Sequence, residues 1–216
     1  EKGKTCLVLD ELQECPNART ALKFFKMDAR YDVICTGSLL GIKGYRDNIV
    51  SVPVGYETEI EMTPMDFEEF LWANGINDKI INSLKSSLTN LTPIPDVLHN
   101  RLRELLLQYV VVGGMPAVVN EFVNTHKMNN VLRMQRDIIN GYRDDMIKYA
   151  AKKDKSHIRE CFDSIPKQLS KENKKFQYSV IKKGASASKY LGSIQWIEDA
   201  GFIRRCYNLN ITELPL

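Results

Sequence analysis

The sequence has no hydrophobic run that could cross a membrane. None approaches the roughly 18 consecutive apolar residues of a spanning helix. The first residues, Glu1-Lys2-Gly3-Lys4, also lack the apolar core of a secretion signal. With 216 residues and 44% hydrophobic content, the chain has the composition of an ordinary globular protein. We therefore expect a cytoplasmic protein with no membrane partner.

Paired cysteines and clustered histidines are missing as well. The five cysteines form no CxxC pair, which excludes a zinc site built on them, and we expect reduced thiols. They are Cys6, Cys15, Cys35, Cys161 and Cys206. The three histidines, His99, His126 and His157, are scattered. Their spacing indicates neither a Ser/His/Asp triad nor a Cys/His pair, so we expect none of them to be catalytic.

The chain also has no phosphate-binding loop. Gly3-Lys4-Thr5 matches the end of a Walker A motif, but no strand precedes it and it runs directly into an apolar strand. A phosphate loop follows a strand and opens a helix, so that backbone N–H groups face the phosphates. No other Gly-Lys-Ser/Thr segment occurs in the sequence.

The most informative feature that is present is an apolar strand, Thr5–Leu9, that stops on two carboxylates, Asp10 and Glu11. Parallel sheets place their ligands just beyond the carboxyl ends of such strands. One carboxylate can hold Mg²⁺ through a water while its neighbour orients the attacking water, as in a Walker B motif. The alternative is that the acidic residues cap the next helix or pair with a surface lysine. If the motif is a Walker B, its phosphate loop lies upstream of Glu1.

A helix and a second strand follow. Ala18–Met27 is predicted as a helix and Tyr31–Thr36 as a strand, which makes a βαβ unit. The carboxyl ends of the two strands then meet, and Asp10 and Ser38 lie at the same edge of the sheet.

The rest of the chain is predicted to be mostly helical. Ser51–Glu61 is expected to contain another strand, and Thr63 or Asp66 to cap the helix after it. Amphipathic spacing then predicts helices over Asp96–Val112, Ala117–Asn124, Asn129–Ala151, Ser156–Leu169 and Ser186–Ala200. Gly201 ends the last helix before a short strand, Phe202–Tyr207. Helix, basic loop, helix and strand in this order fit a winged helix-turn-helix.

Basic charge is concentrated near the C-terminus, although the net charge of the whole chain is only +3. Residues 148–189 hold eleven lysines and one arginine against four acidic residues, a local charge of +8. In the last helix, Ala187, Leu191, Ile194 and Ile197 are predicted to be buried. The opposite face carries Lys189, Ser193 and Trp196, and with Lys182 and Lys183 it forms a candidate DNA surface. An exposed tryptophan favours a protein partner instead, and the lysines fit a solvated surface too.

Five segments in order resemble prokaryotic AAA+ superfamily ATPases that carry a C-terminal domain of unknown function. They are Leu-Val-Leu-Asp-Glu-Leu-Gln-Glu-Cys-Pro-Asn-Ala (7–18), Cys-Thr-Gly-Ser-Leu-Leu-Gly (35–41), Met-Asp-Phe-Glu-Glu-Phe-Leu (65–71), Val-Gly-Gly-Met-Pro (112–116) and Glu-Asn-Lys-Lys-Phe (172–176). The resemblance implies an α/β part followed by a mostly α part. Residues 1–62 would be the C-terminal half of a parallel-sheet P-loop ATPase core, 63–127 a helical lid, and 128–216 a long helix and a winged-helix domain.

The resemblance also implies ATP and Mg²⁺ as cofactors of the intact protein. Asp10 would coordinate Mg²⁺ through a water, and Glu11 would polarise the attacking water. Ser38 resembles a sensor 1 residue, with Thr36 as the alternate, although a serine there fits a plain turn as well.

Two further sites follow from the resemblance. Arg46 lies where this superfamily often supplies an arginine finger, although a solvated loop arginine is the alternative. Gly114 and Pro116 resemble a glycine-x-proline element that packs on the nucleotide base, and a plain helix junction has the same sequence.

Family members begin with a Walker A loop and continue past the winged helix, so this chain is expected to be an inactive fragment of an ATPase. A DNA-binding winged-helix protein and a protein-interaction scaffold with a vestigial site are the alternatives.

Overall fold

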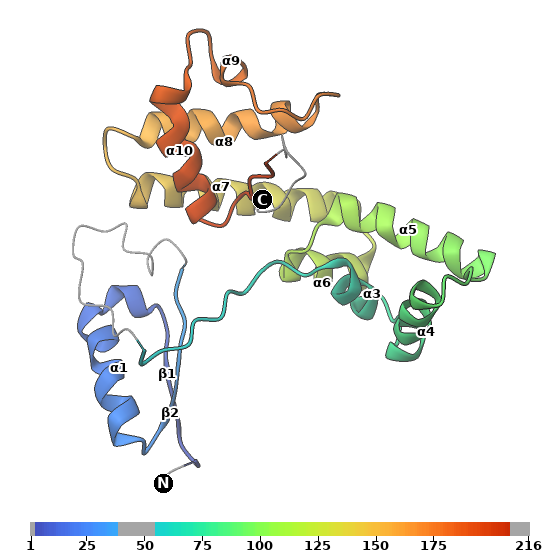
Figure 1. The fold of residues 1–216 in the computed structure, drawn as a ribbon, viewed down its shortest axis with the longest axis horizontal. Coiled ribbons are helices and arrows are strands. Elements are labelled where there is room, and N and C mark those ends of the chain that lie inside the picture. Colours follow the sequence, from blue (N-terminus) through green and yellow to red (C-terminus); the bar gives the residue numbers. More distant parts are fainter. Residues whose placement is uncertain (1–2, 39–54, 208–216) are drawn as a thin grey trace, which may run out of the picture. The chain divides into compact units, whose positions relative to one another are not determined.

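The computed structural model describes residues 3–38 and 55–207 of the chain (Figure 1). Most of these residues are helical, and the strands form a small parallel sheet. The chain divides into two compact units, residues 1–59 with 143–216 and residues 60–142.

The first part of the chain is a βαβ unit, as the sequence predicted. Strand β1 (Cys6–Leu9) pairs in parallel with β2 (Asp32–Cys35), and Leu9 lies opposite Cys35. Between them are a 3-10 turn, η1 (Leu12–Glu14), and helix α1 (Pro16–Asp28). The parallel pairing brings the carboxyl ends of both strands together.

Residues 60–142 contain four helices and most of a fifth: α3 (Phe67–Ala73), α4 (Asp78–Thr89), α5 (Asp96–Val112), α6 (Pro116–Thr125) and the start of α7 (Met128–Tyr149). Asp66 begins α3 with a capping box, because its carboxylate accepts from Glu69 N and the Glu69 carboxylate accepts from Asp66 N. The core of this unit consists of apolar side chains from all five helices: Phe70, Leu71, Ile81, Leu105, Val112, Val118, Val119, Phe122 and Val131.

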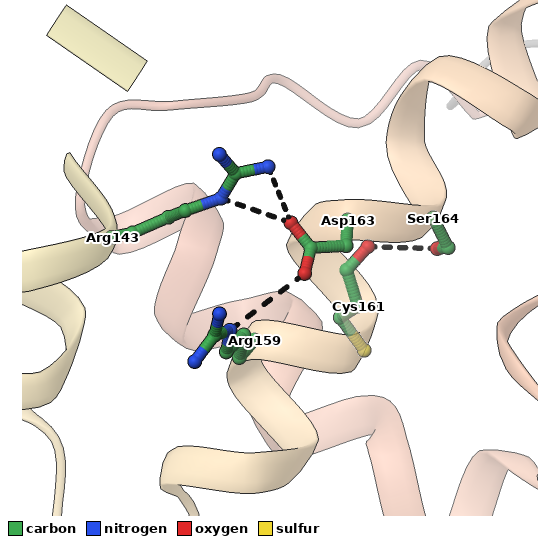
Figure 2. Close-up of polar contacts among 5 residues, drawn as sticks. All are labelled: Arg143, Arg159, Cys161, Asp163 and Ser164. Atoms are coloured by element: carbon green, nitrogen blue, oxygen red, sulfur yellow. Dashed lines mark hydrogen bonds and ion pairs between the residues drawn. The ribbon is translucent and has the colours of Figure 1, made fainter. Parts of the chain in front are cut away.

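The C-terminal part is built on α8 (Lys155–Leu169), the short α9 (Tyr178–Ile181) and α10 (Ala187–Asp199). In Figure 1, α10 crosses α8. The end of α7 is held on α8 by Arg143, whose Nη2 lies 2.9 Å from Asp163 Oδ1 (Figure 2). Arg159 Nε lies 3.8 Å from Oδ2 of the same carboxylate, so Asp163 pairs with two arginines.

Two predicted strands, one in Ser51–Glu61 and one over Phe202–Tyr207, are wrong in the residues that the structure describes. Residues 55–61 and 202–207 contain no strand, while 51–54 lie outside the described residues. The second segment is held by side chains instead. Arg205 N donates to Glu198 Oε1 at 3.0 Å, and the Arg205 guanidinium pairs with the same carboxylate. The predicted wing strand is therefore not observed in residues 202–207, and the short α9 was not predicted.

None of the helices in the described ranges, 3–38 and 55–207, has both the length and the apolar character that a membrane crossing requires.

Candidate functional site

The carboxyl ends of β1 and β2 bring Asp10 and Thr36 into contact. The Thr36 hydroxyl donates a hydrogen bond to Asp10 Oδ1. The backbone of Thr36 is fixed too, because its N–H donates to Leu9 O and its carbonyl accepts from Leu12 N, both at 2.9 Å. Asp10 is exposed. One of its oxygens is therefore oriented by Thr36 while the carboxylate as a whole stays open to a ligand.

Glu11 has a left-handed backbone, with φ 51° and ψ 51°. For a residue with a Cβ, this conformation costs about 1–2 kcal/mol. It lets the chain turn directly from β1 into η1, where Glu14 N donates to Glu11 O at 2.8 Å. The exposed Glu11 carboxylate accepts a hydrogen bond from Gln13 Nε2. Sparsely populated backbone conformations cluster at active sites, but Ala29, Leu91 and His126 share this one, so it is the position of Glu11 at the end of β1 that makes it a functional candidate.

Asp10 and Glu11 are residues at this edge that could hold a metal ion together with waters. Within residues 3–38 and 55–207, no group of three or more His, Cys, Asp or Glu side chains could hold a metal ion. Magnesium keeps several waters and is bound through one or two carboxylates together with substrate phosphates. Asp10 and Glu11 supply that number of carboxylates at the end of a parallel strand.

The two other residues predicted near the phosphates have different outcomes. Ser38 is half-buried and lies two residues beyond Thr36, the residue that contacts Asp10. Arg46 lies outside the described residues. The structure thus shows a contact of Thr36, the alternate sensor residue, with Asp10, and the sensor role of Ser38 stays a prediction.

Gly114 lies directly against the backbone of Met65. Met65 N donates to Gly114 O at 2.7 Å, and Tyr109 Oη donates to Met65 O at 2.9 Å. A Cβ on Gly114 would lie 2.1 Å from Met65 O, so only glycine fits here. Pro116, the first residue of α6, is exposed. The Gly-Gly-Met-Pro junction therefore has a packing role at Gly114 and an open position at Pro116.

The predicted outer face of α10 is wrong in part. Ser193 is 6% exposed and Trp196 7% exposed, so both belong to the buried side. Leu191, predicted to be buried, is 53% exposed, and Ala187, also predicted to be buried, is exposed as well. Tyr190 explains the rotation: its ring packs against His157 and its hydroxyl donates to Glu160, which turns that side of α10 towards α8.

The three lysines of the predicted DNA surface are exposed, but they are not equivalent. Lys182 Nζ lies 2.9 Å from Glu160 Oε1 and forms an ion pair. Lys183 and Lys189 have no such partner in the described part of the chain.

Glu160 lies between two donors, Tyr190 and Lys182. The hydrogen bond from Tyr190, followed by that from Lys182, holds the pKa of the Glu160 carboxyl below its usual value. The same bond, aided by burial, raises the pKa of Tyr190. The carboxylate thus links α8 to the beginning of α10 and to the turn before it.

This link predicts a pH-dependent stability. Because folding lowers the pKa of Glu160, its contribution is present above the unfolded carboxyl pKa and is lost as the pH falls through the lower folded value. Tyr190→Phe is expected to cost about 1–2 kcal/mol at pH 7, since it removes a hydrogen bond to a charged group. The cost should shrink on acidification below the usual carboxyl pKa. The free energy of unfolding is measured at each pH by urea titration, followed by the fluorescence of Trp196 in a Trp72→Phe background.

The matched control is Tyr178→Phe, which removes a half-buried tyrosine hydroxyl that makes no hydrogen bond to another residue in 3–38 or 55–207. Its effect should be small and independent of pH. A Tyr190→Phe cost that stays constant from neutral to acidic pH would contradict the role given to Glu160.

Comparisons with known families match two parts of the chain. Residues 1–71 match the family model described as AAA domain, and residues 103–214 match the one described as Domain of unknown function (DUF8612). The second match covers more than half of the 216 residues. Neither a curated protein nor a solved structure matches the chain. Asp10, Glu11 and Thr36 lie in the first matched region, and α8 to α10 lie in the second.

Proposed function

This chain belongs to the family described as Domain of unknown function (DUF8612). Its residues 1–71 match the AAA domain, and we propose that they are part of a P-loop ATPase that hydrolyses ATP at the end of β1. One observation carries the proposal: Asp10 and Thr36 meet at the carboxyl ends of two parallel strands, with Glu11 following in a strained turn. This is the edge at which parallel α/β sheets bind their ligands.

Asp10 and Glu11 take different parts in the proposed reaction. Mg²⁺, when bound, neutralises the charge that develops on the phosphates. Asp10 would hold it through a water, because the Thr36 hydroxyl orients Oδ1 and leaves the carboxylate open on its other side. Glu11 would accept a proton from the attacking water or polarise it, since its carboxylate is exposed.

Two further roles near the phosphates stay predictions. Ser38 or Thr36 would act as the sensor of the γ-phosphate, and Arg46 would supply positive charge to a neighbouring site. In the other unit, Pro116 is an exposed apolar residue next to the rigid contact between Gly114 and Met65, and a contact with the nucleotide base stays a prediction for it. No Gly-Lys-Ser/Thr loop between a strand and a helix occurs in residues 1–216, so the proposal requires a phosphate-binding loop from outside this sequence.

Replacing Thr36 in the full-length protein tests the geometry at Asp10. Thr36→Val keeps the shape but removes the hydroxyl, so the Mg²⁺ concentration for half-maximal ATP hydrolysis should rise about 10-fold. Thr36→Ser retains a hydroxyl and should stay close to wild type. Mg²⁺ titrations of phosphate release, together with Mg²⁺-dependent binding of a fluorescent ATP analogue, give the result.

Two outcomes would contradict the proposal. Equal behaviour of the Val and Ser variants would remove Thr36 from the metal site. Failure of the full-length protein to bind ATP would favour a scaffold whose acidic pair is vestigial.

A further inference from the structure

Residues 173–197 form a basic segment that contains no acidic residue. Five lysines lie in it: Lys174, Lys175, Lys182, Lys183 and Lys189. The next acidic residues are Glu172 on one side and Glu198 on the other. The segment covers α9, the turn after it and most of α10. Its five lysines therefore lie in or next to these two consecutive helices.

This segment has the element order of a helix-turn-helix, with a first helix of four residues. Helix α9 is joined to α10 by residues 182–186, and Gly184 lies in this turn with φ +81°. Ala185 N donates to Lys182 O at 3.1 Å and closes the turn. Two helices joined by a short glycine-containing turn are typical of DNA-binding modules, in which the second helix enters the major groove.

The exposed side of α10 suits a nucleic acid surface. Its exposed residues are Ala187, Ser188, Lys189, Leu191, Gly192 and Gln195. Several of these side chains are small and none is acidic, so a duplex can approach the helix closely. Leu191 provides an apolar group of the kind that contacts a thymine methyl, and Gln195 an amide of the kind that reads base edges.

The buried side of α10 fixes the orientation of this surface. Tyr190, bound to Glu160 and packed on His157 at a ring distance of 4.8 Å, anchors the first turns of α10 on α8. Gln168 of α8 clamps the segment before α9, because its side-chain amide donates to Gln177 O at 2.8 Å and accepts from Gln177 N at 3.1 Å. The lysines therefore project from a preformed framework, which lowers the entropic cost of binding.

We propose that α9, the turn after it and α10 bind duplex DNA, with Lys183 and Lys189 contacting backbone phosphates and the exposed side of α10 facing the groove. The inference is independent of ATP hydrolysis. Glu160 of α8 is an acidic neighbour of this segment, and its carboxylate is paired with Lys182. Exposed lysines on a segment with no acidic residue of its own fit a polyanion better than a protein partner, whose interface core is depleted of lysine.

The test is fluorescence anisotropy of the full-length protein with a labelled duplex of about 20 base pairs, in about 50 mM and about 200 mM NaCl. The double substitution Lys183→Glu with Lys189→Glu is expected to weaken binding at least 10-fold. It should also reduce the slope of log affinity against log salt by about 2, since each phosphate contact contributes about 0.9. The milder pair Lys183→Gln with Lys189→Gln should give a smaller loss of the same kind, with unchanged helical circular dichroism.

The matched control is Lys79→Glu with Lys127→Glu, two exposed lysines of the other unit with the same change in charge. Its affinity should stay within about 3-fold of wild type. No binding in about 50 mM salt, or equal losses in the two Glu pairs, would overturn the proposal. Protein binding by this face with unchanged DNA affinity in the Lys183/Lys189 variants would overturn it as well.

Discussion

Replacing Glu11 by Gln is expected to lower kcat for ATP hydrolysis by the full-length protein about 100- to 10,000-fold, the range for loss of a general base. An amide keeps the size of the carboxylate but cannot take a proton or polarise water as strongly. ATP affinity should change little, because Asp10 and Thr36 keep their contact. Stability should also change little, because Gln and Glu tolerate the left-handed backbone of residue 11 equally poorly.

Steady-state phosphate release gives kcat, and titration with a fluorescent ATP analogue gives the affinity. Glu14→Gln is the matched control, because Glu14 is an exposed carboxylate of the same 3-10 turn and loses the same charge. Its kcat should stay within about 3-fold of wild type. Retained turnover in Glu11→Gln would show that Glu11 is not catalytic. Loss of ATP affinity would show that Glu11 contributes to ATP binding rather than to activation of the attacking water.

The contact at this edge was predictable in outline from the order of elements. A strand, a helix and a second apolar strand in close succession require a parallel pair, which brings the ends of both strands together. The sequence could not predict the hydrogen bond from Thr36 to Asp10, because that contact depends on the strand register. With Leu9 opposite Cys35, it is Thr36 that reaches Asp10.

The buried face of α10 could not be predicted, because helical periodicity shows which residues share a face but not which side chains bury the most area. Leu191 and Trp196 lie on different sides of the helix, and only one of them can be buried fully. The aromatic rings of Tyr190 and Trp196 bury more area than one leucine, about 150–250 Å² each. Their contacts therefore decide the rotation, and Leu191 is left exposed.

The strand predicted over Phe202–Tyr207 was wrong for a similar reason. Its apolar residues fit a strand, but a strand needs a partner for its backbone groups. Arg205 takes Glu198 as that partner, seven residues away in sequence, and Phe202 N donates to Ile197 O at 3.2 Å. A side-chain carboxylate and a backbone carbonyl of α10 thus accept from two backbone N–H groups that a neighbouring strand would have paired.

The second large effect is expected at Gly114. Gly114→Ala should lower the free energy of unfolding of the unit formed by residues 60–142 by about 2–3 kcal/mol, the upper range for overpacking. The new Cβ would meet a backbone oxygen, Met65 O, at 2.1 Å. A backbone atom cannot rotate away as a side chain does, so the bond from Met65 N to Gly114 O has to break or α6 has to shift.

Gly141→Ala is the control for the change of residue type. Gly141 lies inside α7, and a Cβ there meets nothing within 4 Å. Alanine should therefore stabilise by about 0.5–1 kcal/mol through its higher helix propensity. Urea unfolding monitored by Trp72 in a Trp196→Phe background reports on this unit alone, since the chain has two tryptophans. Equal midpoints for Gly114→Ala and wild type would contradict the tight contact with Met65.

Pro116→Ala separates packing from nucleotide binding in the same motif. Pro116 is exposed at the first position of α6, where alanine is well tolerated, so unfolding should change by less than about 1 kcal/mol. If Pro116 packs on the nucleotide base, the full-length protein should bind ATP about 10-fold more weakly, as loss of one apolar contact of about 1.4 kcal/mol implies. Unchanged ATP affinity in Pro116→Ala would indicate that this motif has a structural role only. The contact of Gly114 with Met65 then explains the glycine without any ligand.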